Sequence, residues 1–224
     1  MDWKPFYEAE RERLGKDAMC AMLERAPRVT GRAVIFPHTR LEVTGDQVAA
    51  AVRFAVESGA DEVLAIGVLH REMKEEFSLD AFDALLALSK KPSLRVHRRF
   101  PPESVDEIDA VARRMPIVAT CDPLHQGIGY GDSPETARAA ADSYDFARAS
   151  IESQLRALSA HDFDAFAAEC ARVRSDFKRS GPAFARAIGR GFSFELRELE
   201  LVDYSKALGA AAPTWVAGAL ITVQ

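Results

Sequence analysis

Residues 32–67 read RAVIFPHTRLEVTGDQVAAAVRFAVESGADEVLAIG, and this stretch decides the fold class. It begins with the apolar run RAVIF (residues 32–36) and ends with the apolar run EVLAIG (residues 62–67). Short runs of this kind, rich in branched residues, are typical of strands that are buried on both faces. The sequence therefore predicts two strands of a covered sheet.

A helix is predicted between these two strands. Apolar positions recur at helical spacing from Val48 until Gly59, and Thr44 forms a capping box with Gln47. The pattern predicts a helix over residues 45–58. A strand, helix, strand order of this length predicts a parallel pair with a right-handed crossover.

The same patterns recur along the rest of the chain. Apolar faces, caps and proline stops predict further helices over residues 79–91, 104–114, 133–160, 161–170 and 182–188. Apolar or alternating runs predict further strands over residues 94–97, 116–120, 194–202 and 214–223. This order predicts a single α/β domain over residues 1–224, built on one mixed, partly parallel sheet flanked by helices. Residues 1–30 are expected to form an N-terminal extension that packs on it.

Composition and charge narrow the classes of function. Of the 224 residues, 48% are hydrophobic and 28% are charged, a balance that excludes a disordered or fibrous chain. The 29 basic and 34 acidic residues give a net charge of -5 and form no basic block. A nucleic-acid partner is therefore not expected, and a small-molecule substrate is.

The cysteines and the N-terminus point to the cytoplasm. The three cysteines, Cys20, Cys121 and Cys170, form no C-x-x-C pair, which argues against a disulfide framework or a structural zinc module. The first residues carry charges without an apolar segment, so no signal peptide is predicted. No run approaches the ~18 apolar residues that a membrane span requires.

Three of the five histidines share one sequence context. His38, His70 and His125 each stand just beyond a predicted strand. Since ligands of open α/β sheets bind at the carboxyl ends of the strands, the three imidazoles are expected to converge on one pocket. Imidazole with carboxylate is the usual ligand set for iron(II) and similar metals. The alternative is that each histidine is merely a polar residue at a strand-to-loop junction.

Other polar residues receive a plainer interpretation. His97, among arginines of a predicted strand, is expected on a solvated face, and His161 is expected in the first turn of a helix. Arg40 could hold an anionic substrate, although a solvated arginine is the commoner outcome. No G-x-S-x-G elbow and no P-loop occurs, which argues against a serine hydrolase or a nucleoside triphosphatase.

Several short motifs together resemble a known family. They are FPH (36–38) followed by TG (44–45), IGVLH (66–70), ATCDPLHQG (119–127), LVDYS (201–205) and TWVAGA (214–219). In this order they resemble the Memo family, relatives of the class III extradiol ring-cleavage dioxygenases. The resemblance covers roughly residues 30–223 and implies the sheet architecture of those dioxygenases.

The resemblance also implies a set of site residues. By position, His38 and His70 become metal ligands, while Asp122 and His125 line the pocket. The family's third ligand is a cysteine, and counting back from the end of the last short helix places Asp176 at that position. His38, His70 and Asp176 would then form a two-histidine, one-carboxylate set.

The third ligand has an alternative. Asp176 could be an exposed acid beside a helix, in which case Cys170 or Cys121 would supply a thiolate.

These residues lead to a functional hypothesis. We expect a mononuclear non-haem metalloenzyme, with Fe(II) as the first choice and Cu or Zn as alternatives, that carries out oxidative chemistry on a small molecule. His125, steered by Asp122, would act as general acid or base. The alternatives are a non-catalytic scaffold that binds a metal or a partner, and a metal-dependent hydrolase that retains zinc.

Overall fold

The computed structural model describes residues 3–70, 76–101 and 115–224. Its strands are β1 (Ala33–Phe36), β2 (Glu62–Ile66), β3 (Arg95–Arg99), β4 (Ile117–Thr120), β5 (Leu124–Gly127), β6 (Phe194–Asp203) and β7 (Thr214–Val223). Its helices are α1 (Trp3–Arg25), α2 (Leu41–Glu57), α3 (Asp80–Leu88), α5 (Ala140–Ala160), α6 (Phe163–Val173), α7 (Gly181–Ile188) and α8 (Ser205–Leu208). Two short 3-10 helices, η1 (Ile128–Tyr130) and η2 (Asp176–Arg179), complete these elements. The helix predicted over residues 104–114 lies outside the described residues.

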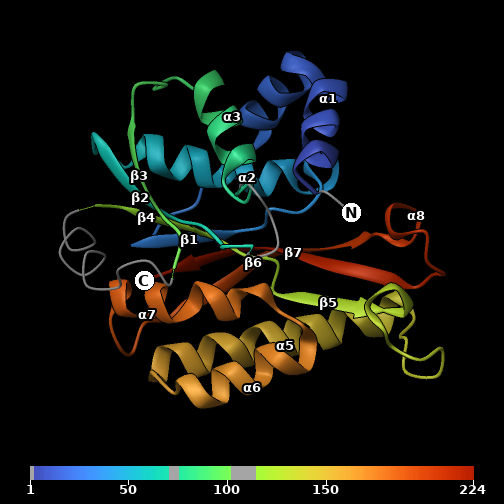
Figure 1. Cartoon of the computed structure of the whole chain (residues 1–224). Helices are drawn as coiled ribbons and strands as arrows, with labels where there is room; N and C mark the ends of the chain where they lie inside the picture. Colours follow the sequence, from blue (N-terminus) through green and yellow to red (C-terminus); the bar gives the residue numbers. More distant parts are fainter. Residues whose placement is uncertain (1–2, 71–75, 102–114) are drawn as a thin grey trace.

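The strands form one mixed sheet between two layers of helices, which confirms the predicted α/β class. In the described part of the chain the order is β3-β2-β4-β1-β7-β5, and β6 pairs with β7. Helices α1, α2 and α3 lie on one side of the sheet, and α5, α6 and α7 lie on the other (Figure 1). The four strands β3, β2, β4 and β1 are parallel, whereas β7 is antiparallel to its neighbours.

The sheet differs from the prediction in one pairing. Strands β1 and β2 run in the same direction, but β4 lies between them and pairs in parallel with both. Because β4 is buried throughout and apolar except for Thr120 at its end, it belongs in the middle of the covered sheet. The expected direct pair of β1 and β2 is therefore wrong, although their relative direction is correct.

Strand β5 was not predicted, because the segment LHQG has no clear strand pattern. It pairs with β7, where Leu124 lies opposite Ala217 and Gly127 lies opposite Thr214. Gly127 has a φ of 109°, and a Cβ there would lie 2.1 Å from the carbonyl oxygen of Pro213. The strand thus ends at a position that only glycine can occupy.

Buried side chains on the two faces of the sheet form separate cores. Alternate residues such as Ile35 and Ile66 pack with Phe184 of α7 on one face. Their neighbours, such as Phe36 and Ala65, pack with the helices on the other face. This arrangement explains why the central strands are apolar except at the strand ends Glu62 and Thr120.

Helix α2 begins at Leu41, so its predicted start at Thr44 is wrong. The Thr44 hydroxyl lies inside the first turn and donates to the carbonyl of Arg40 (3.1 Å). The carboxylate of Glu10, from α1, instead accepts from the backbone amides of Leu41 (2.9 Å) and Glu42 (3.4 Å). A side chain distant in sequence therefore caps this helix, and a local capping box cannot reveal it.

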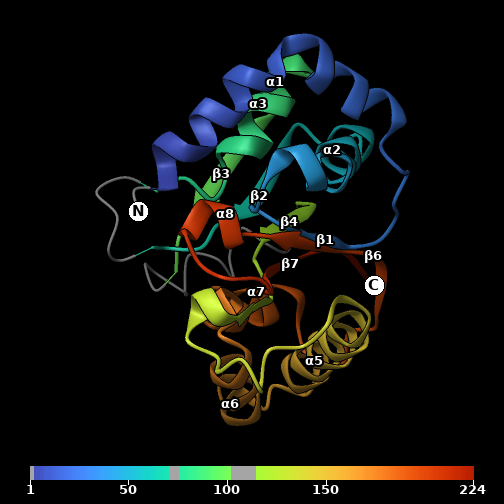
Figure 2. The same ribbon diagram turned by 90° about the vertical axis from the view of Figure 1, so that its right-hand side faces the viewer.

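The N-terminal residues form α1, a helix kinked at Gly15, whose apolar side chains pack against α2 and α3. Figure 2 shows α1 lying across these two helices.

On the other face of the sheet, α5 begins at Ala140 rather than at residue 133. His161 ends α5 in a left-handed conformation (φ 56°) instead of opening the next helix. The predicted first-turn position of His161 is therefore wrong.

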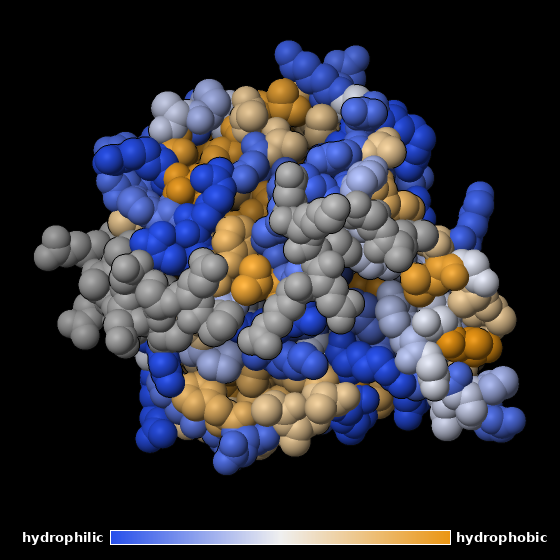
Figure 3. Space-filling view, in the orientation of Figure 1, coloured by the Kyte–Doolittle hydropathy of each residue, from blue (hydrophilic) through white to orange (hydrophobic). Residues whose placement is uncertain are grey.

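Among the described residues, no helix is long and apolar enough to cross a membrane. Hydrophilic and hydrophobic areas alternate on the face shown in Figure 3.

His97 was expected on a solvated face. It is half-buried, and its Nε2 lies 2.9 Å from a carboxylate oxygen of Glu62.

The cap on α2 can be tested by the variant Glu10→Ala. It removes the acceptor for two helix amides, so the free energy of unfolding should fall by about 1–2 kcal/mol. Urea denaturation measures this change. Glu12→Ala, an exposed position on the same helix, should change stability by less than about 0.5 kcal/mol. Equal effects of the two variants would contradict the proposed cap.

Candidate metal centre

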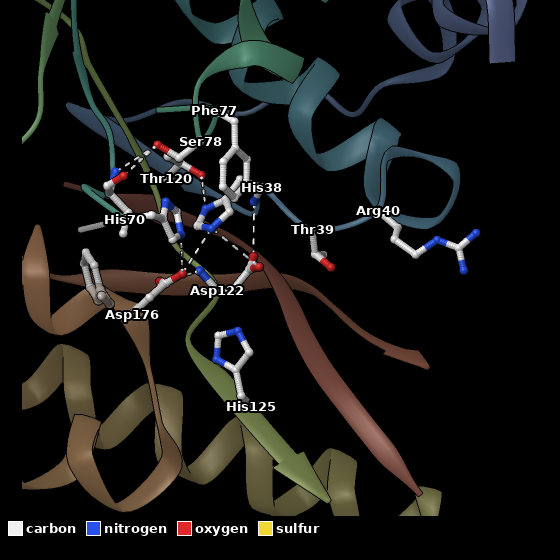
Figure 4. Close-up of polar contacts among 12 residues, drawn as sticks. His38, Thr39, Arg40, His70, Phe77, Ser78, Thr120, Asp122, His125 and Asp176 are labelled. Carbon is white, nitrogen blue, oxygen red and sulfur yellow. Dashed lines mark hydrogen bonds and ion pairs between the residues drawn. The ribbon is translucent and has the colours of Figure 1, made fainter. Parts of the chain in front are cut away.

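Four polar side chains meet at the carboxyl edge of the parallel strands. His38 follows β1, His70 follows β2 and Asp122 follows β4, so the common direction of these strands brings the three together. Asp176, the first residue of η2, approaches the same place from the segment after α6. Figure 4 shows the two imidazoles above the two carboxylates.

The nearest contacts join two histidines to one carboxylate. Asp176 Oδ2 lies 3.1 Å from His38 Nε2 and 4.0 Å from His70 Nε2. One ligand atom from each of these residues lies within 4.8 Å of the others. His38 is buried, and His70 and Asp176 are half-buried. The cluster could hold a metal ion.

Each of these imidazoles has its second nitrogen occupied by the protein. His70 Nδ1 donates to Glu76 Oε1 (2.9 Å), and His38 Nδ1 lies 3.1 Å from the hydroxyl of Thr120. When Nδ1 carries the proton, Nε2 keeps its lone pair for a metal. The ring of Phe77 stacks on His70 at 4.5 Å and fixes its plane. Such partners orient ligands and strengthen metal binding.

Glu76 was not anticipated from the sequence, where it is one of two adjacent acids without a recognisable motif. Its carboxylate also accepts from the backbone amides of His70 (2.7 Å), Phe77 (2.9 Å) and Ser78 (3.1 Å). Burial alone would raise the pKa of Glu76, but the hydrogen bonds from His70 and Phe77 outweigh it and lower the pKa to about 2. Glu76 is therefore an ionised acceptor behind His70.

Backbone hydrogen bonds tie the two aspartates together. The amide of Asp122 donates to Asp176 Oδ1 (2.8 Å), and the amide of Asp176 donates to the carbonyl of Asp122 (3.3 Å). Asp122 Oδ1 in turn accepts from the backbone amide of His38 (3.2 Å), and its Oδ2 lies 3.7 Å from His38 Nε2. The loops after β1 and β4 and the start of η2 thus form one connected unit.

Charge in this unit favours a cation. Burial raises the pKa of Asp122, since the attraction of His38 does not fully offset it. Burial also opposes ionisation of Asp176, but the neighbouring His38 holds the pKa of Asp176 below its usual value. Burial alone would lower the pKa of His38, yet Asp122 and Asp176 outweigh it and raise the pKa to about 9. A proton on His38 thus compensates the carboxylates, and a metal cation could take its place.

His125 lies in β5, close to the aspartates but differently oriented than expected. Its Nδ1 donates to the backbone carbonyl of Arg174 (2.8 Å), and its ring meets the edge of Tyr130 at 5.1 Å. Ligand atoms of Asp122, His125 and Asp176 lie within 4.8 Å of one another, a second group that could hold a metal. Because β5 pairs with β7, the Nδ1 of this ring contacts Arg174 and not Asp122, and the steering of His125 by Asp122 stays a prediction.

The remaining sequence candidates lie outside these clusters. Cys121 and Cys170 are buried free thiols, and burial raises the pKa of both. Neither belongs to a metal-binding group among the residues that the structure describes. Arg40 pairs with Glu42 (2.6 Å) and Glu10 (3.3 Å) and points away from the histidines (Figure 4), so it is not a substrate anchor.

Fold and site together define an α/β protein with buried His/Asp clusters that could hold a metal ion at the carboxyl edge of its sheet. No family model and no curated protein matches the chain. The resemblance to the Memo family stays a prediction that rests on the short motifs.

The raised pKa of His38 predicts how the metal-free protein responds to pH. Because the folded-state pKa is about 9 and the ordinary value is 6.5, the proton on His38 stabilises the fold fully below pH 6.5. This contribution should be lost as the pH rises from about 6.5 to 9. Thermal unfolding in EDTA should show a falling Tm over this range. His38→Gln should have a flatter profile, and equal slopes for the two proteins would contradict the assignment.

Proposed function

We propose that the chain is a mononuclear non-haem metalloenzyme that binds Fe(II) through His38, His70 and Asp176 and acts as an oxidoreductase on a small molecule. The observation that carries this proposal is the approach of two imidazole Nε2 atoms to one carboxylate oxygen, at 3.1 Å and 4.0 Å. Two histidines and one carboxylate form the ligand set of non-haem Fe(II) oxygenases. The resemblance to relatives of extradiol dioxygenases favours the same chemistry.

The donor set fits a divalent cation. The other nitrogen of each ring contacts Thr120 or Glu76, so each Nε2 can bind a metal, which on His38 would replace the proton that this ring otherwise carries. The carboxylates of Asp122 and Asp176 supply the negative charge that a cation requires. Iron(II) held by three protein ligands keeps open positions and supplies redox chemistry with dioxygen. The absence of Cys121 and Cys170 from the described clusters argues against a thiolate site for copper(I).

His125 is the residue best placed to move a proton. Its Nδ1 is fixed as a donor by the carbonyl of Arg174, so its Nε2 is the basic nitrogen. The imidazole lies next to the carboxylates of Asp122 and Asp176, which would stabilise it after it accepts a proton from a substrate. We assign His125 as general acid or base. Asp122 contributes charge rather than a direct hydrogen bond to Nδ1.

The ligand set is tested by metal analysis of protein purified under anaerobic conditions. Wild-type protein should bind one equivalent of iron, and His38→Ala, His70→Ala and Asp176→Ala should each lose most of it. Their circular dichroism should still show the helix content of the wild type. Cys121→Ser and Cys170→Ser, as matched buried controls, should keep the metal.

Two outcomes would contradict the proposed site. Loss of metal in a cysteine variant with retention in Asp176→Ala would indicate a thiolate site. Retention of zinc in preference to iron, without oxygen uptake on any substrate, would favour a metal-dependent hydrolase instead.

The role of His125 is tested by comparing metal content with turnover. His125→Ala should retain iron but lose oxygen uptake, with catechol as the first substrate tested, by ~100- to 10,000-fold, as expected for a missing general acid or base. Its rate profile against pH should lose one limb. Asp122→Asn should have a smaller effect on rate. If His125→Ala instead loses the metal, His125 is a ligand and its proposed role is wrong.

A further inference from the structure

A pocket adjoins His125 on the side of β5, the end of α6 and the start of α5. It has a volume of about 540 Å³, within the range of small-molecule sites. Its lining includes His125, Gln126, Arg138, Phe146 and Arg174. His125 therefore belongs both to this pocket and to the His/Asp cluster beside the proposed metal site.

The N-terminus of α5 lies at this pocket without a side-chain cap. The helix has 21 residues, and its N-cap residue, Ala139, offers no side-chain acceptor. Ala139 and Asp142, of the first turn, both line the pocket. The first amides of the helix have no partner within the helix, and the helix dipole makes this end positive. These features favour an anion.

Arg138, directly before the helix, forms no close ion pair among the described residues, although its charge acts on the carboxylate of Asp132. Its guanidinium carbon lies 3.8 Å from the centre of the Phe146 ring, which holds the guanidinium plane and leaves its N–H edges available. No carboxylate of the described chain forms an ion pair with it. By contrast, Arg172 pairs with Glu169 and Arg174 pairs with Asp132 (2.7 Å).

A buried amide in the same lining also lacks partners. Gln126 is 4% exposed, and neither its Oε1 nor its Nε2 has a hydrogen-bond partner among the residues described. Alternation along β5 places Gln126 on the same face as Leu124, which packs against Ala147 and Val173 of α5 and α6. Buried polar groups are normally satisfied, so this amide has hydrogen-bonding capacity left for a ligand of the pocket.

The charges of the lining select the kind of anion. The carboxylates of Asp132, Glu135 and Asp142 also border the pocket. With Asp132 paired to Arg174, the free charges are one guanidinium, the helix N-terminus and two exposed acids. The two acids would repel a dianion such as a phosphate monoester, and a single carboxylate group can pair with one guanidinium.

We propose that this pocket binds a small organic carboxylate, held by Arg138 and the first amides of α5, with Gln126 as a further hydrogen-bonding group. The rest of such a ligand would extend toward His125. That the carboxylate belongs to the substrate rests on the proposed function, whereas its binding does not require the metal. Arg174 joins the two regions, because its side chain lines the pocket and its carbonyl holds His125.

The test is an NMR titration of ¹⁵N-labelled, metal-free protein with benzoate. Benzoate should shift the side-chain amide of Gln126 and the backbone amides of residues 140–142. Benzamide, which has the same shape without the charge, should bind at least tenfold more weakly, and phosphate should not compete. Arg138→Gln should weaken benzoate binding about tenfold, as expected for a lost charge-assisted pair. Arg148→Gln, an exposed position on the same helix, should have no effect.

Several outcomes would overturn the inference. They are the absence of benzoate binding, equal binding of benzamide, equal effects of Arg138→Gln and Arg148→Gln, or tighter binding of phosphate. Iron analysis of Arg138→Gln separates this proposal from the proposed function. If iron binds but benzoate does not, only the carboxylate pocket is wrong. If benzoate binds but the wild type takes up no iron, only the metal site is wrong.

Discussion

The carboxylate of Asp176, held 3.1 Å from His38 Nε2 in a largely buried place, is the contact around which the site is built. Ionised groups are costly to bury unless they are paired or bind a metal. Asp122 adds a second carboxylate and Glu76 a third, so the surroundings of His38 and His70 have an excess of negative charge. A cation at this point would satisfy the whole group, and without a metal the proton on His38 takes over part of that role.

The fold keeps these charges together by using the parallel part of the sheet. Strands β1, β4 and β2 end at the same edge, so each needs only a short loop to deliver its polar residue. Helix α1 closes the side of His38. Tyr7 of this helix stacks on Phe77, with 5.3 Å between the ring centres. The Tyr7 hydroxyl lies 2.7 Å from the Tyr204 hydroxyl, which in turn lies 2.7 Å from the hydroxyl of Thr39. This aromatic cover limits the access of water to the proposed ligands.

Sequence patterns predicted the parts of this arrangement that depend on local order. The apolar runs predicted the central strands. The rule that ligands bind at the carboxyl ends of strands predicted that His38 and His70 lie at one edge of the sheet. Asp176 could be named only through the resemblance to a family motif, and the structure places it beside both histidines. Glu76 and the cap from Glu10 depend on contacts that no local pattern encodes. Strand β5 exists because β7 pairs with it, so the tetrapeptide alone suggested a loop.

The central claim is that one metal ion is bound by His38, His70 and Asp176. Crystals grown anaerobically with Fe(II), measured on both sides of the iron absorption edge, test it most directly. The account predicts one anomalous peak that lies about 2.0–2.2 Å from the Nε2 atoms of His38 and His70 and from a carboxylate oxygen of Asp176. A peak beside Cys121 or Cys170, or no peak at this edge of the sheet, would contradict it.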